Sequence, residues 1–232
     1  MAMFMVKPWY KKDDFDPDAC FDANNTATEE NFIKLLEHGV YDRKYIGYFV
    51  TLSNTVDYNG GKWVIADVNH DSANTGQTNC YDLISEGCFH NGEFGSSNDS
   101  WRSSTARTWL NDTFYPAFST EFKNHILNLK YNSQGTWYTD DKIILPSKVE
   151  VNGGTAYGTD NEGVAYPIFT GTTGTDSIAS RIKTYNNSAQ YWWTRSRRTE
   201  ISGTVWDVTT DGSMTIYYYW NPYYLAPVLR VS

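Results

Sequence analysis

The chain has 232 residues and a formal net charge of -8, with 19 Lys and Arg against 27 Asp and Glu. This balance excludes nucleic acid as a partner, because no basic stripe exists outside Arg195, Arg197 and Arg198. No apolar run is long enough to span a membrane, so no membrane partner is expected either. The 18 Tyr, 9 Trp, 11 Phe and 17 Gly favour short strands joined by polar turns.

The first 27 residues are rich in charged and polar side chains. We expect residues 1–27 to form an arm that becomes ordered against another surface, either a second copy of the chain or a virion partner. The segment lacks the continuous apolar core of a signal peptide. We therefore expect synthesis in the cytosol, followed by incorporation into a virion or display by a carrier.

Residues 28–232 read as a single domain, because no repeat and no sharp linker divides them. Thr28 is a good N-cap for a helix that ends at Gly39. Residues 45–52 and 62–68 are apolar, β-branched and aromatic, and the turn-rich residues 57–61 lie between them. This pattern predicts a pair of strands.

Residues 67–76 alternate acidic and amide oxygens, as a calcium-binding loop does. A helix-loop-helix calcium site needs Gly at its sixth position and Glu at its twelfth, where this chain has Ser72 and Thr78. A hydrogen-bonded polar loop is favoured, and no metal or other cofactor is expected. Three cysteines, Cys20, Cys80 and Cys88, form no closed disulfide framework, so buried thiols are favoured over a Cys80–Cys88 bridge.

The middle of the chain carries the strongest helical signals. Ser104 precedes one helix with Trp109 and Leu110 inward, and Ser119 caps a second that extends through residue 130. His125 lies beside the apolar face of this second helix, and a structural role is favoured. Residues 141–149 predict a strand ending at Pro146, and residues 151–178 form a long polar excursion. Residues 181–185 return the chain to the core.

The C-terminal residues 191–232 concentrate aromatic side chains in short strand-like pieces. Asp211-Gly212 between residues 205–210 and 213–219 predicts a β-hairpin. Six aromatic residues follow within eight positions, more than the inner face of one strand can hide, because successive side chains point to opposite faces. The six residues are Tyr217, Tyr218, Tyr219, Trp220, Tyr223 and Tyr224. Some of these six rings are therefore expected at the surface.

No nucleotide-binding, zinc-binding or nucleophile-elbow motif is present in the sequence. A pair of carboxylates for glycoside hydrolysis stays open as an alternative, since their separation is a three-dimensional property.

Five segments in order carry a resemblance to an uncharacterised bacterial and phage domain family, over residues 45–232. The segments are Trp109-Leu110-Asn111 with residues 114–119, then residues 141–145, residues 191–196, residues 208–212 and residues 226–231. The family resembles a branch of the C-type-lectin fold, related to the formylglycine-generating-enzyme type and to the variable proteins of diversity-generating retroelements. Two departures concern the subfamily: Arg197 replaces a common proline, and Ala226-Pro227 with a later Arg230 replaces an R-P-A sequence.

The resemblance implies an α+β fold of the C-type-lectin type, with short antiparallel strands, two to three helices and long irregular loops. It also implies that residues 192–196, 205–210, 213–219 and 226–231 are successive strands of one C-terminal sheet. Formylglycine-generating enzymes need cysteines in the C-terminal part of the fold, and here none follows Cys88. The resemblance therefore implies recognition rather than catalysis.

The expected function is recognition of a host-surface protein or glycan by a phage or retroelement-diversified protein. The alternatives are an enzyme acting on polysaccharide and a structural virion subunit. Trp192, Trp193 and Arg195 are expected inside the scaffold, with Arg195 paired to a carboxylate or to carbonyl groups. Tyr and Trp offer large rigid surfaces at low entropic cost, so the ligand surface is placed on the tail. Its expected residues are Arg197, Arg198, Glu200, Trp206, Asp207, Thr209, Tyr217, Tyr219, Trp220, Asn221, Tyr223 and Tyr224.

Overall fold

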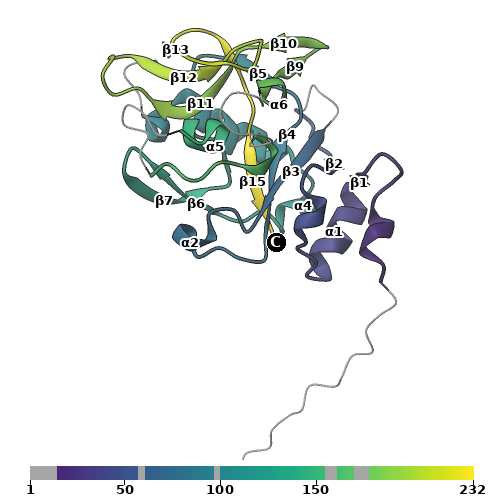
Figure 1. Cartoon of the computed structure of the whole chain (residues 1–232). Coiled ribbons are helices and arrows are strands. Elements are labelled where there is room, and N and C mark those ends of the chain that lie inside the picture. The colour runs from purple at the N-terminus through teal and green to yellow at the C-terminus, as the bar shows by residue number, and fades with distance from the viewer. Residues whose placement is uncertain (1–14, 57–60, 97–99, 155–160, 170–177) are drawn as a thin grey trace, which may run out of the picture.

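The computed structural model describes residues 15–56, 61–96, 100–154, 161–169 and 178–232. Many strands and a few short helices make it an α+β fold, as expected (Figure 1). Two sheets form the frame of the molecule, and a continuous apolar core includes strands of both.

The larger sheet has six strands in the order β1-β2-β3-β4-β15-β8. Their bounds are β1 Thr26–Thr28, β2 Phe49–Thr51, β3 Lys62–Val68, β4 Tyr81–Ser85, β15 Val228–Val231 and β8 Ile143–Ile144. The β1–β2 pair is parallel and the other pairs are antiparallel. Every residue of β4 and of β15 is buried, so these strands lie at the centre of the domain.

The second sheet has five strands in the order β13-β12-β11-β14-β5. Their bounds are β13 Met214–Tyr218, β12 Thr204–Val208, β11 Trp192–Arg197, β14 Tyr223–Leu225 and β5 Phe89–Gly92. The β12–β13 hairpin closes over Asp211-Gly212, as the sequence predicts. Two small hairpins complete the strands: β6 Leu129–Ser133 with β7 Thr136–Asp141, and β9 Lys183–Tyr185 with β10 Ser188–Gln190.

The helices are short and lie around the two sheets. The α-helices are α1 Glu29–Glu37, α2 Ser72–Thr75, α3 Thr105–Trp109, α4 Thr120–Lys123, α5 Lys148–Asn152 and α6 Ile178–Arg181. Single turns of 3-10 helix span Pro17–Cys20, Arg43–Tyr45, Trp101–Ser103, Tyr115–Ala117 and Pro167–Phe169, and a π-helical turn spans Leu110–Phe114. The Thr28 hydroxyl accepts a hydrogen bond from the Asn31 amide, which confirms the predicted cap of α1.

The expected N-terminal arm needs a correction at its boundary. Cys20 and Ala27 are buried, Phe21 stacks on Tyr45, and β1 pairs with β2. These contacts place residues 15–27 in the folded domain, because their apolar side chains join its core. Residues 1–14 of the expected arm lie outside the described residues.

The second predicted helix of the middle segment is shorter than expected. Helix α4 ends at Lys123, because the next residues pair with the C-terminal strand: the Leu127 amide donates to the Arg230 carbonyl, and Ile126 bridges Val231. His125 Nδ1 lies 2.9 Å from the Ser232 carbonyl oxygen, in keeping with its expected structural role. The predicted strands at 45–52 and 141–149 are also shorter, reduced to β2 and β8.

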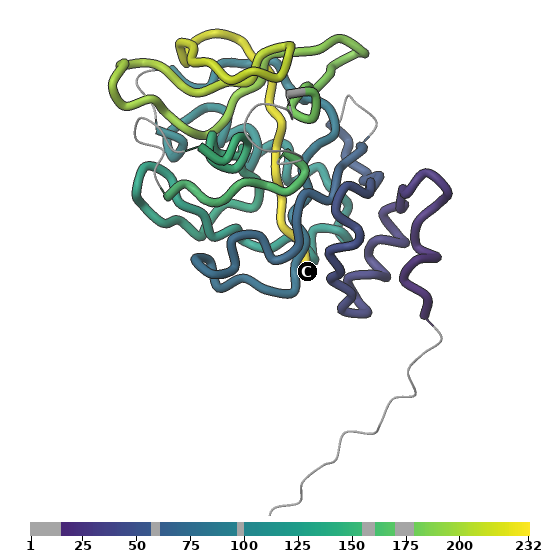
Figure 2. Tube along the Cα trace, in the orientation of Figure 1, coloured from purple at the N-terminus to yellow at the C-terminus, as the bar shows by residue number. Residues whose placement is uncertain are grey.

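The last strand belongs to a different sheet from the one expected. β14 lies in the five-stranded sheet, and after Ala226-Pro227 the chain enters the six-stranded sheet as β15, between β4 and β8. Figure 2 shows this segment, in yellow, running from one sheet down into the other. The expectation of a single C-terminal sheet that includes residues 226–231 was wrong, because residues 228–231 pair with the earlier strands β4 and β8. Cys20, Cys80 and Cys88 are buried free thiols, so the alternative Cys80–Cys88 bridge is absent.

Candidate functional site: an aromatic strip on the five-stranded sheet

Arg195 holds the five-stranded sheet to the rest of the domain through a buried ion pair. Its guanidinium donates to both oxygens of Glu150, at 2.6 and 2.8 Å, and to the carbonyls of Leu145 and Glu162, at 3.0 and 2.8 Å. Trp192, Trp193 and Arg195 have no exposed surface. The expectation that these residues form the scaffold is confirmed.

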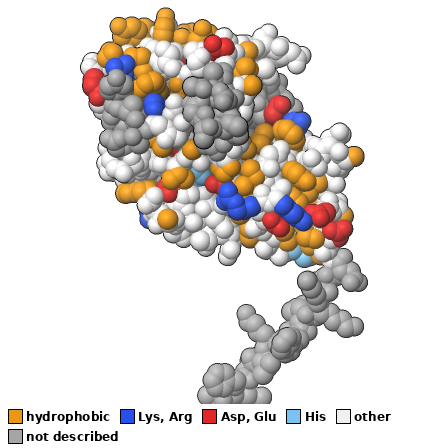
Figure 3. Space-filling view, viewed as in Figure 1, with side chains coloured by type: hydrophobic (Ala, Val, Ile, Leu, Met, Phe, Trp, Pro, Cys, Tyr) orange, Lys and Arg blue, Asp and Glu red, His pale blue; other side chains and the backbone are white. Residues whose placement is uncertain are grey.

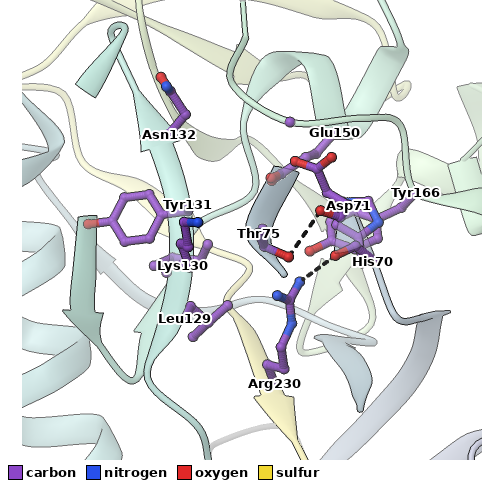
Figure 4. A pocket seen from close by; sticks show the side chains of 12 residues that line it. His70, Asp71, Thr75, Leu129, Lys130, Tyr131, Asn132, Glu150, Tyr166 and Arg230 are labelled. Atoms are coloured by element: carbon purple, nitrogen blue, oxygen red, sulfur yellow. Dashed lines mark hydrogen bonds between the residues drawn. The ribbon is translucent and has the colours of Figure 1, made fainter. Parts of the chain in front are cut away.

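A second buried ionic cluster surrounds a small cavity lined by residues of β6 and β15. Arg230 contacts both oxygens of Asp82, at 2.5 and 2.9 Å, and the Tyr166 hydroxyl donates to Asp82 at 2.8 Å. Figure 4 shows His70, Glu150, Tyr166 and Arg230 around this cavity. Its volume of about 10 Å³ holds at most one water molecule. This cluster therefore stabilises the scaffold and is too small to bind a ligand.

The site best suited to a ligand is a continuous series of aromatic rings at the end of the five-stranded sheet. We call it the aromatic strip: Tyr191, Tyr217, Tyr218, Tyr219, Trp220 and Tyr223. Neighbouring ring centroids lie 4.5 to 6.3 Å apart, from Tyr191 through Tyr223, Tyr217 and Tyr218 to Trp220 and Tyr219. These distances are typical of stacked and edge-to-face ring pairs.

Much of the strip faces solvent. The exposed fractions are 39% for Tyr191, 43% for Tyr217, 45% for Tyr218 and 48% for Trp220. Figure 3 shows hydrophobic side chains gathered along the upper end of the molecule, over the region of β12 and β13. Contiguous exposed apolar surface of this kind is typical of an interaction site in a folded protein.

The position of β13 explains why the strip is exposed. β13 is an edge strand, paired with β12 on one side, and successive residues point to opposite faces. Tyr217 faces Tyr223, whereas Tyr218 points to the other face and stacks on Trp220, with centroids 4.5 Å apart. The rings therefore surround the edge of the sheet.

Asp207 lies on the same face as Tyr217, beneath the strip. Asp207 is on β12, opposite Thr215 of β13 on one side and Trp193 of β11 on the other. Its exposed fraction is 0%. Neither carboxylate oxygen has a hydrogen-bond partner in the structure. Burial raises the pKa of this carboxyl to about 7. The expectation that Asp207 stands on the exposed ligand surface is corrected, because neighbouring strands and rings cover it.

Tyr223 lies close to Asp207 and to the hydroxyls of Tyr217 and Tyr191. Burial, the nearby Asp207 carboxylate and the hydroxyls of Tyr217 and Tyr191 together raise the pKa of Tyr223 to about 12. Its ring lies 4.8 Å from Trp193, 4.9 Å from Tyr191 and 5.4 Å from Tyr217, measured between centroids. Four aromatic rings and one unpaired carboxyl thus form one cluster.

Comparison with known protein families identifies the family of this chain. A family model for a domain of unknown function, DUF6273, matches residues 80–232. The chain belongs to the DUF6273 family. No curated protein and no solved structure matches the chain. The DUF6273 match includes all five strands of the sheet and the whole aromatic strip, whereas β1, β2 and β3 precede it.

Two of the expected ligand residues instead shape turns of the DUF6273 domain. The Thr209 hydroxyl bonds to Asp211 and to the Ser213 carbonyl, which fixes the β12–β13 turn. Asn221 donates from its backbone and its side chain to the Tyr218 carbonyl, at 3.0 and 3.1 Å, and so closes the turn before β14. Their contribution is to hold the aromatic strip in place.

The remaining expected residues lie beside the strip or behind it. Arg198 is half-buried, and its Nε lies 3.8 Å from a carboxylate oxygen of the exposed Glu200; Arg197 is also half-buried. Trp206 is half-buried on the opposite face from Asp207, with the Lys148 ammonium 5.1 Å from its ring centroid. Tyr224 packs on Tyr185 at 5.0 Å. The structure therefore joins only Tyr217, Tyr219, Trp220 and Tyr223 of the expected set into the strip.

Two members of the strip are additional to the expected set, Tyr191 and Tyr218. Tyr218 alternates with Tyr217, so period-two reasoning assigns it to the hidden face, yet an edge strand exposes both faces. Tyr191 precedes β11 and reaches the strip through the parallel β11–β14 pairing. The only local sequence signal that places Tyr191 in the strip is its position directly before a buried strand.

Gly203 lies against the Tyr219 and Trp220 rings of the strip, and its backbone has a left-handed φ of +79°. A Cβ at this position would lie 3.1 Å from Cε1 of Tyr219 and 3.7 Å from Cζ3 of Trp220. We expect Gly203→Ala to lower the free energy of unfolding by about 1–3 kcal/mol and to displace the Tyr219 ring. Urea titration followed by Trp fluorescence measures the loss.

The matched control is Gly135→Ala. Gly135 has φ +81°, but a methyl group added there would meet no atom within 4 Å, so its substitution carries the backbone strain alone. Equal losses for the two variants would contradict a supporting role for the contact between Gly203 and the rings.

Within the described part of the chain, no three His, Cys, Asp or Glu side chains come together as a metal site. In the loop for which hydrogen bonding was favoured over calcium, Asp67 bonds to Arg43 at 3.0 Å and to His70 at 2.9 Å. No helix among the described residues is long and apolar enough to cross a membrane.

Proposed function

We propose that this protein is a non-enzymatic recognition protein that binds a ligand on a host surface, a protein or a glycan, through the aromatic strip. The observation that supports the proposal is the continuous exposed series of rings from Tyr191 to Trp220 on a rigid sheet. Rigid tyrosine and tryptophan rings lose little entropy on binding and dominate the energy of many interfaces.

The proposal includes a C-type-lectin type of fold and display on a phage tail or a similar particle. It rests on the order of the sequence segments described above and on an α+β domain that ends in a sheet with an exposed aromatic edge. The resemblance to retroelement-diversified variable proteins implies a ligand surface between and on the outer faces of the C-terminal strands. A near-copy of the coding region for residues 191–232 beside a reverse-transcriptase gene would support diversification of this chain.

The test compares a strip variant with a control variant in binding to host cells and to a glycan array. Trp220 in the strip and Trp137 on β7 are similarly exposed, at 48% and 41%. We expect Trp220→Ala, combined with Tyr217→Ala, to weaken binding at least tenfold, because hot-spot aromatic residues contribute about 2 kcal/mol or more. Trp137→Ala should bind like the unmodified protein.

Circular dichroism of each variant checks that the fold is intact. Equal binding by the strip variant and the Trp137 variant would contradict the proposal. Cleavage of a polysaccharide that is abolished by a single Asp or Glu substitution would instead establish the enzymatic alternative.

A further inference from the structure

Asp207 differs from every other buried carboxylate in the part of the chain that the structure describes. The others all accept hydrogen bonds from side chains: Asp67, Asp82, Asp141, Glu150 and Glu162. Asp207 is as buried as these, yet both its oxygens lack a partner. An unpaired buried polar group is destabilising, so its presence calls for a compensating role.

The surroundings of Asp207 are suited to a positive charge. Tyr191, Trp193, Tyr217 and Tyr223 lie on its face of the sheet, and their rings form one chain of contacts centred on Tyr223. The face of an aromatic ring carries partial negative charge and attracts ammonium groups, most strongly where water is excluded. No cationic side chain of the described residues bonds to the carboxylate.

We propose that Asp207 and the rings of Tyr191, Tyr217 and Tyr223 form a subsite for an alkylammonium group of the ligand. This subsite rests on the proposed function, because the same rings belong to the aromatic strip. A metal ion fits less well, since a single carboxylate among rings offers too few oxygen ligands.

Access to the carboxyl requires side chains to move, because its exposed fraction is 0%. β12 is next to the edge strand, and Tyr217 on that edge strand is already 43% exposed. In the proposed subsite the ammonium enters beside Tyr217 and pairs with the carboxylate. The ligand's positive charge stabilises the ionised form, so binding near pH 7 releases up to about half a proton.

The experiment uses choline as the probe and 3,3-dimethylbutan-1-ol as its neutral isostere, titrated into the full chain at constant ionic strength and followed by NMR. We expect choline at pH 8 to bind at least tenfold more tightly than the alcohol. At pH 5 the carboxyl is protonated, and choline binding should weaken at least tenfold, to the level of the alcohol. A parallel titration with N-acetyl-lysine methylamide distinguishes a lysine side chain from a quaternary ammonium as the source.

Asp207→Asn is the decisive variant, since its amide keeps the shape of the carboxyl and removes the charge. We expect it to bind choline and the alcohol equally at both pH values. Glu37→Gln, on the exposed end of α1, removes one charge elsewhere and should keep the preference for choline. Near-UV circular dichroism confirms that Asp207→Asn is folded.

Two results would overturn the subsite: equal binding of choline and the alcohol by the unmodified protein, or an unchanged choline preference in Asp207→Asn. If host binding still depends on Trp220 and Tyr217 in that case, only the subsite is wrong and the proposed function stands. If host binding is indifferent to those rings as well, both proposals fail.

Discussion

Arg195→Met is expected to lower the free energy of unfolding by about 3–5 kcal/mol, because it removes one partner of a buried ion pair. The Arg195 side chain is 0% exposed and Glu150 is 5% exposed. Without the guanidinium, the Glu150 carboxylate loses both charged donors, and the Leu145 and Glu162 carbonyls lose a donor each. Urea unfolding followed by Trp fluorescence measures the change.

Lys34→Met provides the matched control for this prediction. Lys34 and Glu30 form an ion pair at 2.7 Å, but their side chains are 46% and 79% exposed. Solvent screens such a pair, so we expect a loss far smaller than that of Arg195→Met. If Arg195→Met does not fold, Arg195→Lys tests the same contact, since lysine keeps the charge and loses the two-pronged geometry. A loss from Arg195→Lys as small as that of the control would contradict the prediction.

The second large effect is the pH dependence that Asp207 gives to stability. Its pKa is about 7 in the folded protein, against 3.8 ordinarily. Between these values the folded state holds a proton that the unfolded state has lost, so the free energy of unfolding falls as pH rises. One pH unit corresponds to about 1.4 kcal/mol, so this carboxyl lowers stability by up to about 4 kcal/mol between about pH 4 and pH 7.

Asp207→Asn removes this contribution, because an amide does not ionise. We expect the difference in unfolding free energy between the variant and the unmodified protein to grow with pH and to level off above about pH 7. Burial also raises the pKa of Glu162, which adds a slope of the same sign to both proteins and cancels in the difference. A difference that stays constant from pH 4 to pH 8 would show that Asp207 is already ionised at low pH.

Local patterns in the sequence predict those parts of the fold that local interactions determine. Thr28 caps α1 because its hydroxyl reaches an amide three residues away, and Asp211-Gly212 adopts a turn that few other pairs allow. Helix α4 shows the limit of such patterns. Its sequence favours helix beyond Lys123, but pairing of residues 126 and 127 with β15 competes with the helix, and the distant strand prevails.

The sequence predicts the residue types of the candidate site better than it predicts how those residues are arranged. Crowding of aromatic residues shows that some rings must face solvent, and Tyr217 and Trp220 do so. Alternation alone does not reveal which strand forms the edge of the sheet, so Tyr218 was not expected in the strip. It also does not reveal which face is covered, and Asp207 therefore reads as a surface residue although its neighbours bury it.

The placement of β15 between β4 and β8 has a consequence for how the protein is made. Ribosomes deliver β4 and β8 before residues 228–231 emerge, so the central sheet stays open at both strands until those residues have been synthesised. During that interval one edge of β4 has no partner strand, and the side chains of β4, all buried in the folded protein, are not yet covered. We expect folding to be slow and late, and the yield of native protein to depend on keeping nascent chains apart until β15 inserts.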